Sequence, residues 1–201
     1  MIARLTGVLL AKGPTEIIVD AGGVGYGVSI PLSTYEALGE VRSQVSIFTY
    51  LHVREDVLQL YGFATEEERD VFRALIGVNG IGPKMAQGIL SGIPAADLKS
   101  HILTGNFSAL TAIPGVGRKI AERMVVELKD KIARMESVSP AAATGTDGQS
   151  RVRAEALMAL TSLGYNRQAA ERAIRAAMQD AGGSDATVES LIKAALRHAS
   201  Q

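Results

Sequence analysis

The sequence contains no cysteine, no long hydrophobic run and no excess of one charge sign. Without cysteine, disulfides and thiolate metal sites are excluded, which fits a reducing cytoplasm. No apolar stretch approaches the roughly 20 residues that a membrane-spanning helix needs. The opening residues, MIARLTGVLLAKG, lack the apolar core and cleavage site of a signal peptide and predict a strand. We therefore expect a folded cytoplasmic protein outside the membrane, without metal or other cofactor.

The charges cancel: 21 basic and 21 acidic residues give a net charge of zero. A basic footprint is the usual signature of a nucleic-acid-binding protein. The separate segments show little of such a footprint either: the net charge is −2 for residues 1–64, +1 for residues 65–136 and +2 for residues 151–201. If this chain binds DNA, it must use locally placed donors rather than a broad positive field.

Residues 1–64 have the pattern of short β-strands. Besides the opening strand, β-branched runs and period-two alternation predict strands at Ile17–Asp20, Gly25–Ile30, Val45–Val53 and Val57–Phe63. A short helix is predicted between the third and fourth strands, at Pro31–Leu38. Five such strands are compatible with a small closed barrel of the OB type.

A helical pattern begins at Thr65, where Thr65-Glu66-Glu67-Glu68 has the form of a capping box. Thr65 is expected to cap the helix while the Glu68 side chain reaches back to the N-cap. Residues 65–136 then predict several short helices broken by glycines. Residues 137–150, SVSPAAATGTDGQS, predict a flexible linker. Residues 151–201 predict a compact unit of three helices, at Ala154–Leu163, Arg167–Gln179 and Thr187–Ala199.

A repeat lies within the helical segment. Residues 75–90, LIGVNGIGPKMAQGIL, align with residues 110–125, LTAIPGVGRKIAERMV, and each copy predicts a helix, a tight Gly-x-Gly turn and a second helix. The glycines allow φ > 0 and expose backbone without Cβ atoms. The second helix begins directly after the turn, so its unpaired N–H groups and positive dipole end form an anion site. Three cations lie in the first turn of these second helices: Lys84, Arg118 and Lys119. A cation there is unfavourable next to the positive end of the helix dipole, so its placement indicates a neighbouring phosphate.

A single glycine turn between two helices is more often a packing connection than a binding site. Two copies with the same apolar frame and the same lysine favour phosphate binding. Nucleotide binding is the weaker alternative, because neither turn follows a strand or carries the third glycine of a dinucleotide fingerprint. No Gly-x-x-x-x-Gly-Lys-Ser/Thr string occurs either.

The two copies resemble the helix–hairpin–helix motif, which grasps DNA phosphates without reading sequence. A five-stranded barrel, tandem hairpin units, a linker and a three-helix domain, in this order, resemble the RuvA family of bacterial Holliday-junction-recognition proteins. The resemblance covers the chain except the linker. Its most specific strings are His52-Val53-Arg54-Glu55-Asp56, Leu60-Tyr61-Gly62-Phe63, Asn79-Gly80-Ile81-Gly82-Pro83-Lys84, Pro114-Gly115-Val116-Gly117-Arg118-Lys119 and Leu163-Gly164-Tyr165.

The resemblance implies an α+β multidomain protein that forms a homotetramer, or an octamer on DNA, through its barrel. Such a protein holds a four-way junction open and flat with residues 65–136. It recruits the hexameric motor ATPase RuvB through residues 151–201, and the nuclease RuvC acts on the same junction. It has no catalytic activity of its own and serves DNA recombination and DNA repair, including the SOS response.

The resemblance also assigns roles to residues. Phosphate contacts are expected at Asn79, Gly80, Gly82, Lys84, Gly115, Gly117, Arg118, Lys119 and Arg123. Glu55 and Asp56 would form an acidic pin at the junction centre, where two carboxylates repel phosphates; without the resemblance they predict an ordinary charged turn. The candidates for binding the motor are Leu163, Tyr165, Leu191 and Leu196. Apolar residues in a helical domain this small more often belong to its core.

Two other classes of function stay open. A base-excision glycosylase also uses hairpin–helix motifs, but it needs a catalytic carboxylate in a base-sized pocket. Glu127 and Asp130 follow the second motif, on what the pattern predicts to be a solvated helix face. A single-strand binder would instead need exposed barrel aromatics for base stacking. The barrel segment offers Tyr26, Tyr35, Phe48, Tyr50, Tyr61 and Phe63, several of them on strand faces where burial is expected.

Overall fold

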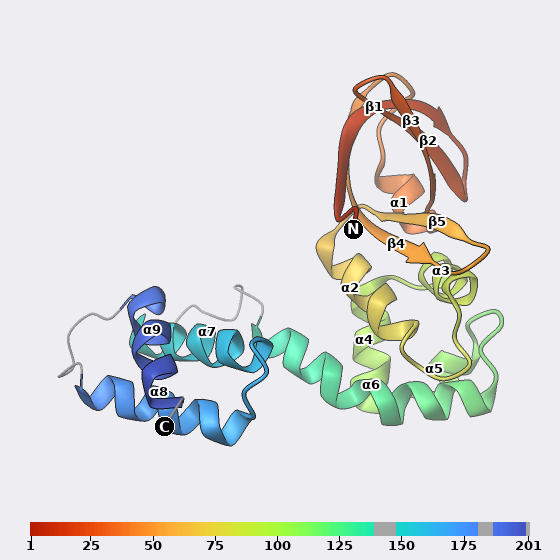
Figure 1. The fold of residues 1–201 in the computed structure, drawn as a ribbon. Helices are drawn as coiled ribbons and strands as arrows, with labels where there is room; N and C mark the ends of the chain where they lie inside the picture. The colour runs from red at the N-terminus through yellow and green to blue at the C-terminus, as the bar shows by residue number, and fades with distance from the viewer. Residues whose placement is uncertain (139–147, 181–186, 200–201) are drawn as a thin grey trace. The chain divides into compact units, whose positions relative to one another are not determined.

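The computed structural model describes residues 1–138, 148–180 and 187–199. The chain forms two compact units, Met1–Ser137 and Val138–Gln201. The first unit contains a β-barrel and the helices that follow it, and the second is helical (Figure 1). Within the described ranges, every helix is too short or too polar to cross a lipid bilayer.

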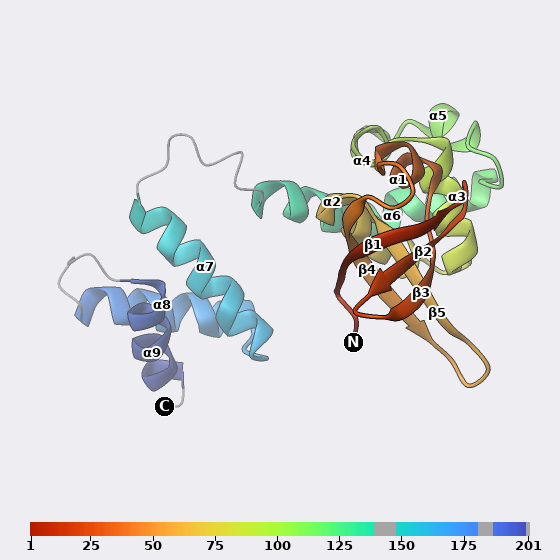
Figure 2. The same ribbon diagram turned by 90° about the horizontal axis from the view of Figure 1, so that it is seen from above.

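Five strands close the barrel in the order β1-β2-β3-β5-β4 (Figures 1 and 2). Their bounds are Arg4–Lys12, Glu16–Ala21, Val24–Ser29, Gln44–Val53 and Leu58–Phe63 for β1 to β5. Neighbouring strands are antiparallel, except that β3 and β5 meet in parallel at Ser29 and Tyr61. Helix α1, Leu32–Ala37, connects β3 to β4. The predicted five-stranded barrel of the OB type, with its short helix, is confirmed.

Alternate side chains of the strands fill the barrel, as the period of two in a strand requires. Ile17 and Val19 of β2 are 1% and 0% exposed, and Val45 and Ile47 of β4 are 7% and 0% exposed. The sequence alternation that predicts the strands is therefore also the pattern that builds the core.

Helices α2 to α6 follow the barrel, at Glu66–Leu75, Pro83–Gly92, Ala95–Thr104, Phe107–Thr111 and Arg118–Val138. Thr65 caps α2 as predicted, since its hydroxyl accepts from the Glu68 N–H at 3.1 Å. The other half of the predicted capping box is wrong. The Glu68 carboxylate accepts from the N–H of Ala64, at 3.2 Å, and from the Thr34 hydroxyl of α1, at 2.7 Å. Burial against α1 therefore overrides the local pattern.

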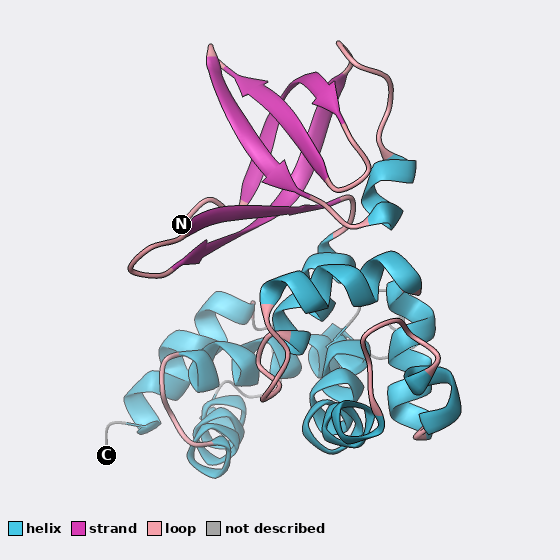
Figure 3. Cartoon of the chain, turned by 90° about the vertical axis from the view of Figure 1, so that its right-hand side faces the viewer, coloured by secondary structure: helices cyan, strands magenta, loops and turns pink. Residues whose placement is uncertain are grey.

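The barrel has a core of its own, but its last strand also packs into the core of the helices that follow, although the sequence divides the two parts at residue 64. Phe72 of α2 packs its ring against Tyr61 and Phe63 of β5, with centroid distances of 5.1 and 4.9 Å. Tyr50 of β4 lies at 5.6 Å from the same ring. Burial raises the pKa of the Tyr61 hydroxyl above its ordinary value. Figure 1 shows β4 and β5 at the end of the barrel that faces α2, and Figure 3 shows the strands of the barrel in magenta, viewed from the side.

The second unit consists of α7, Gly148–Ser162, α8, Arg167–Asp180, and α9, Val188–Ala199. The described part of this unit has the three predicted helices, but α7 begins six residues before the predicted Ala154, within the predicted linker. Small residues such as Ala156, Ala170 and Ala173 let the helices pack closely. Gly164 ends α7 with φ +97°, and the next N–H, of Tyr165, donates to Leu160 O at 3.2 Å. This left-handed glycine is a common helix terminator.

The predicted linker, residues 137–150, falls largely outside the described residues. Its two ends are described and are helical, because α6 reaches Val138 and α7 begins at Gly148. The predicted break at Gly182-Gly183 also lies outside the described residues.

Gly7 of β1 tests the close approach of two barrel strands. A Cβ there would lie 2.0 Å from the Asp20 carbonyl oxygen of β2, so backbone must move to admit it. Gly7→Ala should therefore lower the free energy of unfolding by about 2 kcal/mol or more, as overpacked sites do. Denaturant unfolding followed by tyrosine fluorescence measures this, because four of the five tyrosines lie in the barrel segment.

Gly25→Ala is the matched control, since its Cβ would meet only the Ile18 methyl at an ordinary 3.6 Å. Equal stability of the two variants would contradict the tight β1–β2 approach.

Candidate nucleic-acid interface

The first hairpin, residues 76–82, turns between α2 and α3. Two buried apolar side chains anchor it: Val78 and Ile81 are 2% and 4% exposed, and the Ile81 N–H donates to Val78 O at 3.0 Å. Asn79 and Gly80, between them, are exposed, and Gly80 has φ +94°. Gly82 is the exposed N-cap of α3. The turn thus points its apolar residues inward and its glycines outward.

The second hairpin, residues 112–117, repeats this geometry between α5 and α6. Ile113 and Val116 are 5% and 4% exposed, and the Val116 N–H donates to Ile113 O at 3.0 Å. Gly115 has φ +84°, matching Gly80. In the second hairpin the Ala121 N–H donates to Gly117 O at 3.0 Å. In the first, the Ala86 N–H of α3 donates to Gly82 O at 2.9 Å. The repeat in the sequence is therefore a repeat in hydrogen bonding.

Backbone N–H groups are free at both turns. The amides of Gly80, Gly82, Gly115 and Gly117 donate to no acceptor in the described part of the chain. Apart from the two adjacent residues of the chain, no atom lies within 4 Å of the place where a Cβ of Gly82 or Gly117 would stand. Both glycines stand at the start of a helix, where the dipole is positive. Each hairpin can therefore bring backbone donors directly against an anion such as a phosphate.

The predicted cations surround these amides. Lys84, in the first turn of α3, and Lys119, in the first turn of α6, are both exposed. Arg118 Nε donates to Glu122 Oε1 at 3.0 Å, but the two side chains are 87% and 51% exposed. Such solvated pairs contribute little, so Arg118 can exchange this carboxylate for a phosphate at small cost.

The two hairpins lie side by side and are braced together. Arg123 of α6 donates from Nη1 to Asn79 O of the first hairpin, at 3.1 Å. In the other direction, the Met85 methyl of α3 lies 4.0 Å from the place of a Gly115 Cβ. The family resemblance implies that Arg123 is a phosphate ligand. The sequence gives no sign of its contact with Asn79, because the two residues lie far apart in the chain.

Glu55 and Asp56 stand at the tip of the hairpin that joins β4 to β5. Arg54 and Val57 close the turn, with N–H···O distances of 2.8 Å from Arg54 to Val57 and 3.3 Å in return. Both carboxylic residues are exposed. Figure 2 shows this hairpin extending beyond the rest of the barrel. The geometry presents two carboxylates to whatever approaches the tip.

The four candidates for motor binding in the second unit differ in exposure. Leu163, after the end of α7, is 62% exposed, whereas Leu191 of α9 is 2% exposed and belongs to the core. Tyr165 and Leu196 are half-buried and pack against that core. Burial removes Leu191 from the accessible surface. Met158 of α7, which no sequence pattern singles out, is 44% exposed.

The structure weighs against both alternative functions. Tyr61 and Phe63 are 5% and 0% exposed, and the other four candidate barrel aromatics are half-buried. Residues 1–64, which are described throughout, therefore offer no exposed ring for base stacking. Glu127 and Asp130 are exposed on α6, as solvated charges are.

The positive φ angles of Gly80 and Gly115 give a test of the hairpins. Alanine at either position is forced into a left-handed conformation, so Gly80→Ala and Gly115→Ala should each lower the free energy of unfolding by about 1–2 kcal/mol. Gly82→Ser is the control, because Gly82 has φ −89° and open space, and serine is a good N-cap. Chemical denaturation measures all three; a loss with Gly82→Ser alone would contradict the described turns.

Comparisons with known proteins agree with this architecture. Family models match along the chain: the RuvA N terminal domain at residues 1–62, the SAM-like helix-hairpin-helix tandem at residues 72–130 and the RuvA C-terminal domain at residues 151–200. The chain is 45% identical over 204 residues to the Holliday junction branch migration complex subunit RuvA of Geotalea daltonii, covering 98% of each chain. It is 46% identical over 199 residues to the protein of that name from Chloroherpeton thalassium, again over 98% of each chain. The chain belongs to the RuvA family.

Proposed function

We propose that this protein binds four-way DNA junctions by their shape, as a homotetramer or, on DNA, an octamer, and holds them open in the cytoplasm. It recruits the motor ATPase RuvB for branch migration and shares the junction with the nuclease RuvC. The observation that carries the proposal is the matched pair of hairpins, each with free amides, a left-handed glycine and a cation at a helix start. The names of the relatives, as subunits of a Holliday junction branch migration complex, support the choice of substrate.

The hairpins act as phosphate clamps. Their donors are backbone amides and flexible cations, which meet the sugar–phosphate backbone and read no base edges. The net charge of zero gives no broad field to strengthen a single clamp. Affinity must come from several clamps acting on one DNA, as linked sites raise avidity without new contacts. A symmetric assembly of subunits on the arms of a junction supplies that number.

Glu55 and Asp56 act as the acidic pin. Two carboxylates close to phosphates repel them, so a continuous duplex that crosses the centre of the assembly is disfavoured. A junction, whose strands part at the centre, escapes this repulsion. Selectivity then arises from a repulsive element as well as from attractive ones.

The protein acts as a non-catalytic subunit, with the ATPase in its partner. The second unit is the proposed docking site for the motor, with the exposed Leu163 and the half-buried Tyr165 and Leu196 as its contacts. Leu191 supports this surface from the core.

The clamp lysines determine the salt dependence of binding. Lys84→Ala with Lys119→Ala should weaken junction binding, and the slope of log K against log salt should flatten by about 0.9 for each phosphate that the variant no longer neutralises. Titrations at several salt concentrations measure this. Lys129→Ala, an exposed lysine further along α6, is the matched control and should leave the slope unchanged. An unaltered slope in the double variant would mean that the clamps are elsewhere.

Charge reversal at the pin separates selectivity from affinity. Glu55→Lys with Asp56→Lys should retain or strengthen DNA binding, because two repulsive charges become attractive. The preference for a junction over plain duplex should fall. Competition between the two DNAs measures it, with Glu55→Gln and Asp56→Asn as the neutral variant of intermediate effect. A uniform loss of binding to both DNAs would count against a central pin.

A further inference from the structure

A buried carboxylate lies between the barrel and the helices, outside the clamps and the pin. Glu68 of α2 is 6% exposed and Thr34 of α1 is 0% exposed. We propose that this Glu68–Thr34 contact is a positioning device: it fixes the acidic pin relative to the phosphate clamps and so sets the preference for four-way junctions over duplex. The inference rests on the proposed function and adds to it two specificity-determining residues that touch no DNA.

The contact ties three elements together. The Thr34 hydroxyl donates to Glu68 Oε2 at 2.7 Å and accepts from the Ala64 N–H at 3.0 Å. The same N–H lies 3.2 Å from Glu68 Oε2, and the Ser33 hydroxyl donates to Glu68 Oε1. Ala64 directly follows the last residue of β5, so α1, α2 and β5 meet at one carboxylate. A buried carboxylate is held in place only while its hydrogen-bond partners remain.

The same face of α2 also holds the strands of the pin. Phe72 follows Glu68 by one helical turn and packs against Tyr50 of β4 and Tyr61 of β5. These two strands carry the pin at their tip. At its other end, α2 leads directly into the first hairpin. Helix α2 therefore connects the two parts: its side packs against the strands that carry the pin, and its C-terminal end leads into the first clamp.

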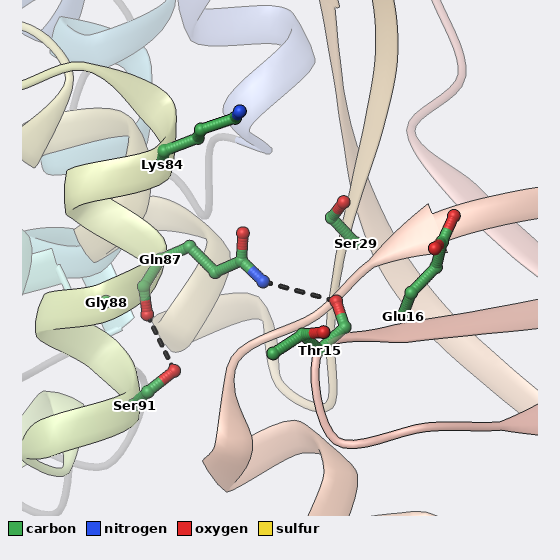
Figure 4. A pocket seen from close by; sticks show the side chains of 7 residues that line it. All are labelled: Thr15, Glu16, Ser29, Lys84, Gln87, Gly88 and Ser91. Atoms are coloured by element: carbon green, nitrogen blue, oxygen red, sulfur yellow. Dashed lines mark hydrogen bonds between the residues drawn. The ribbon is translucent and has the colours of Figure 1, made fainter.

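A second set of hydrogen bonds ties the helix after the clamp to the barrel. Gln87 of α3 donates from Nε2 to Ile30 O at 2.7 Å and to Thr15 O at 3.2 Å. Ser91, one turn later, donates to Gln87 O at 2.8 Å and accepts from the Leu32 N–H at 3.1 Å. Figure 4 shows Gln87 reaching from α3 to the barrel, across a groove of about 370 Å³. The first clamp is thus fixed to the barrel from both sides.

Repulsion by the pin depends on where the pin stands. Exposed charges are screened by salt over about 8 Å at physiological ionic strength. The pin carboxylates can act on a phosphate only if the clamps hold that phosphate within this range. Plain duplex needs the clamps alone. Loosening the barrel against the helices should therefore reduce junction preference while leaving duplex affinity nearly unchanged.

The test uses the full chain with conservative variants. Thr34→Val keeps the shape of the side chain and removes the hydroxyl, Thr34→Ser keeps the hydroxyl, and Glu68→Gln removes the charge. Glu36→Gln, at an exposed carboxylate of α1, controls for the change in net charge. Dissociation constants are measured for a synthetic four-way junction and for a linear duplex of equal length. Thr34→Val and Glu68→Gln should lower the junction-over-duplex ratio about tenfold with duplex affinity within about twofold, whereas Thr34→Ser and Glu36→Gln should keep the wild-type ratio.

An unchanged ratio in Thr34→Val and Glu68→Gln would overturn the inference. A wild-type protein that does not prefer the junction would instead overturn the proposed function, so the two failures are distinguishable. A distance measurement between the barrel and the helices distinguishes a loss of positioning from a general loss of stability. The chain has no cysteine, so spin labels at Val53→Cys of β4 and Val126→Cys of α6, diluted among unlabelled subunits, report one intramolecular distance.

With Thr34→Val, this distance distribution should broaden below the unfolding temperature, and with Thr34→Ser it should not. A reduced ratio with an unbroadened distribution would overturn the positioning role.

Discussion

The DNA binding that we propose depends on one interaction: an exposed backbone N–H at the start of a helix, placed to meet a phosphate. The residues of each hairpin place this N–H at the surface. The buried side chains of Val78 and Ile81 anchor the turn to the core. The left-handed backbone of Gly80 reverses the chain direction, so that the amides face outward. Gly82 leaves the approach clear of side-chain atoms. Because α5 and α6 repeat the arrangement, the chain carries two such sites, braced by the contact from Arg123 to Asn79.

An interaction of this kind carries affinity without selectivity, since every duplex offers the same phosphates. Selectivity must come from the placement of clamps and of opposing charge. In this proposal the packing of β4 and β5 against α2 is therefore functional as well as structural. Phe72 and Glu68 on one face of α2 join the strands of the acidic hairpin to the helix that enters the first clamp. A flexible connection between barrel and helices would keep the clamps and lose the fixed geometry.

The sequence predicts the parts of this fold better than their connections. β-Branched runs and period-two alternation predict the five strands, and the repeat at residues 75–90 and 110–125 predicts both hairpins. Contacts across the chain leave no local pattern, so the brace from Arg123 and the groove spanned by Gln87 are not predictable. The capping box misleads at Glu68, because α1 supplies hydroxyls that the local pattern does not contain. Leu191 and Leu163 look alike in sequence, and only packing separates core from surface.

The most direct test of selectivity by arrangement is a competition titration against a labelled four-way junction. The competitors are an unlabelled junction of unrelated sequence and a linear duplex with the same number of phosphates. If amide clamps arranged around an acidic centre recognise the DNA, the unrelated junction competes as well as the original. The duplex then needs at least about tenfold more, the ratio that corresponds to 1.4 kcal/mol. Equal competition by the duplex would contradict selectivity by arrangement.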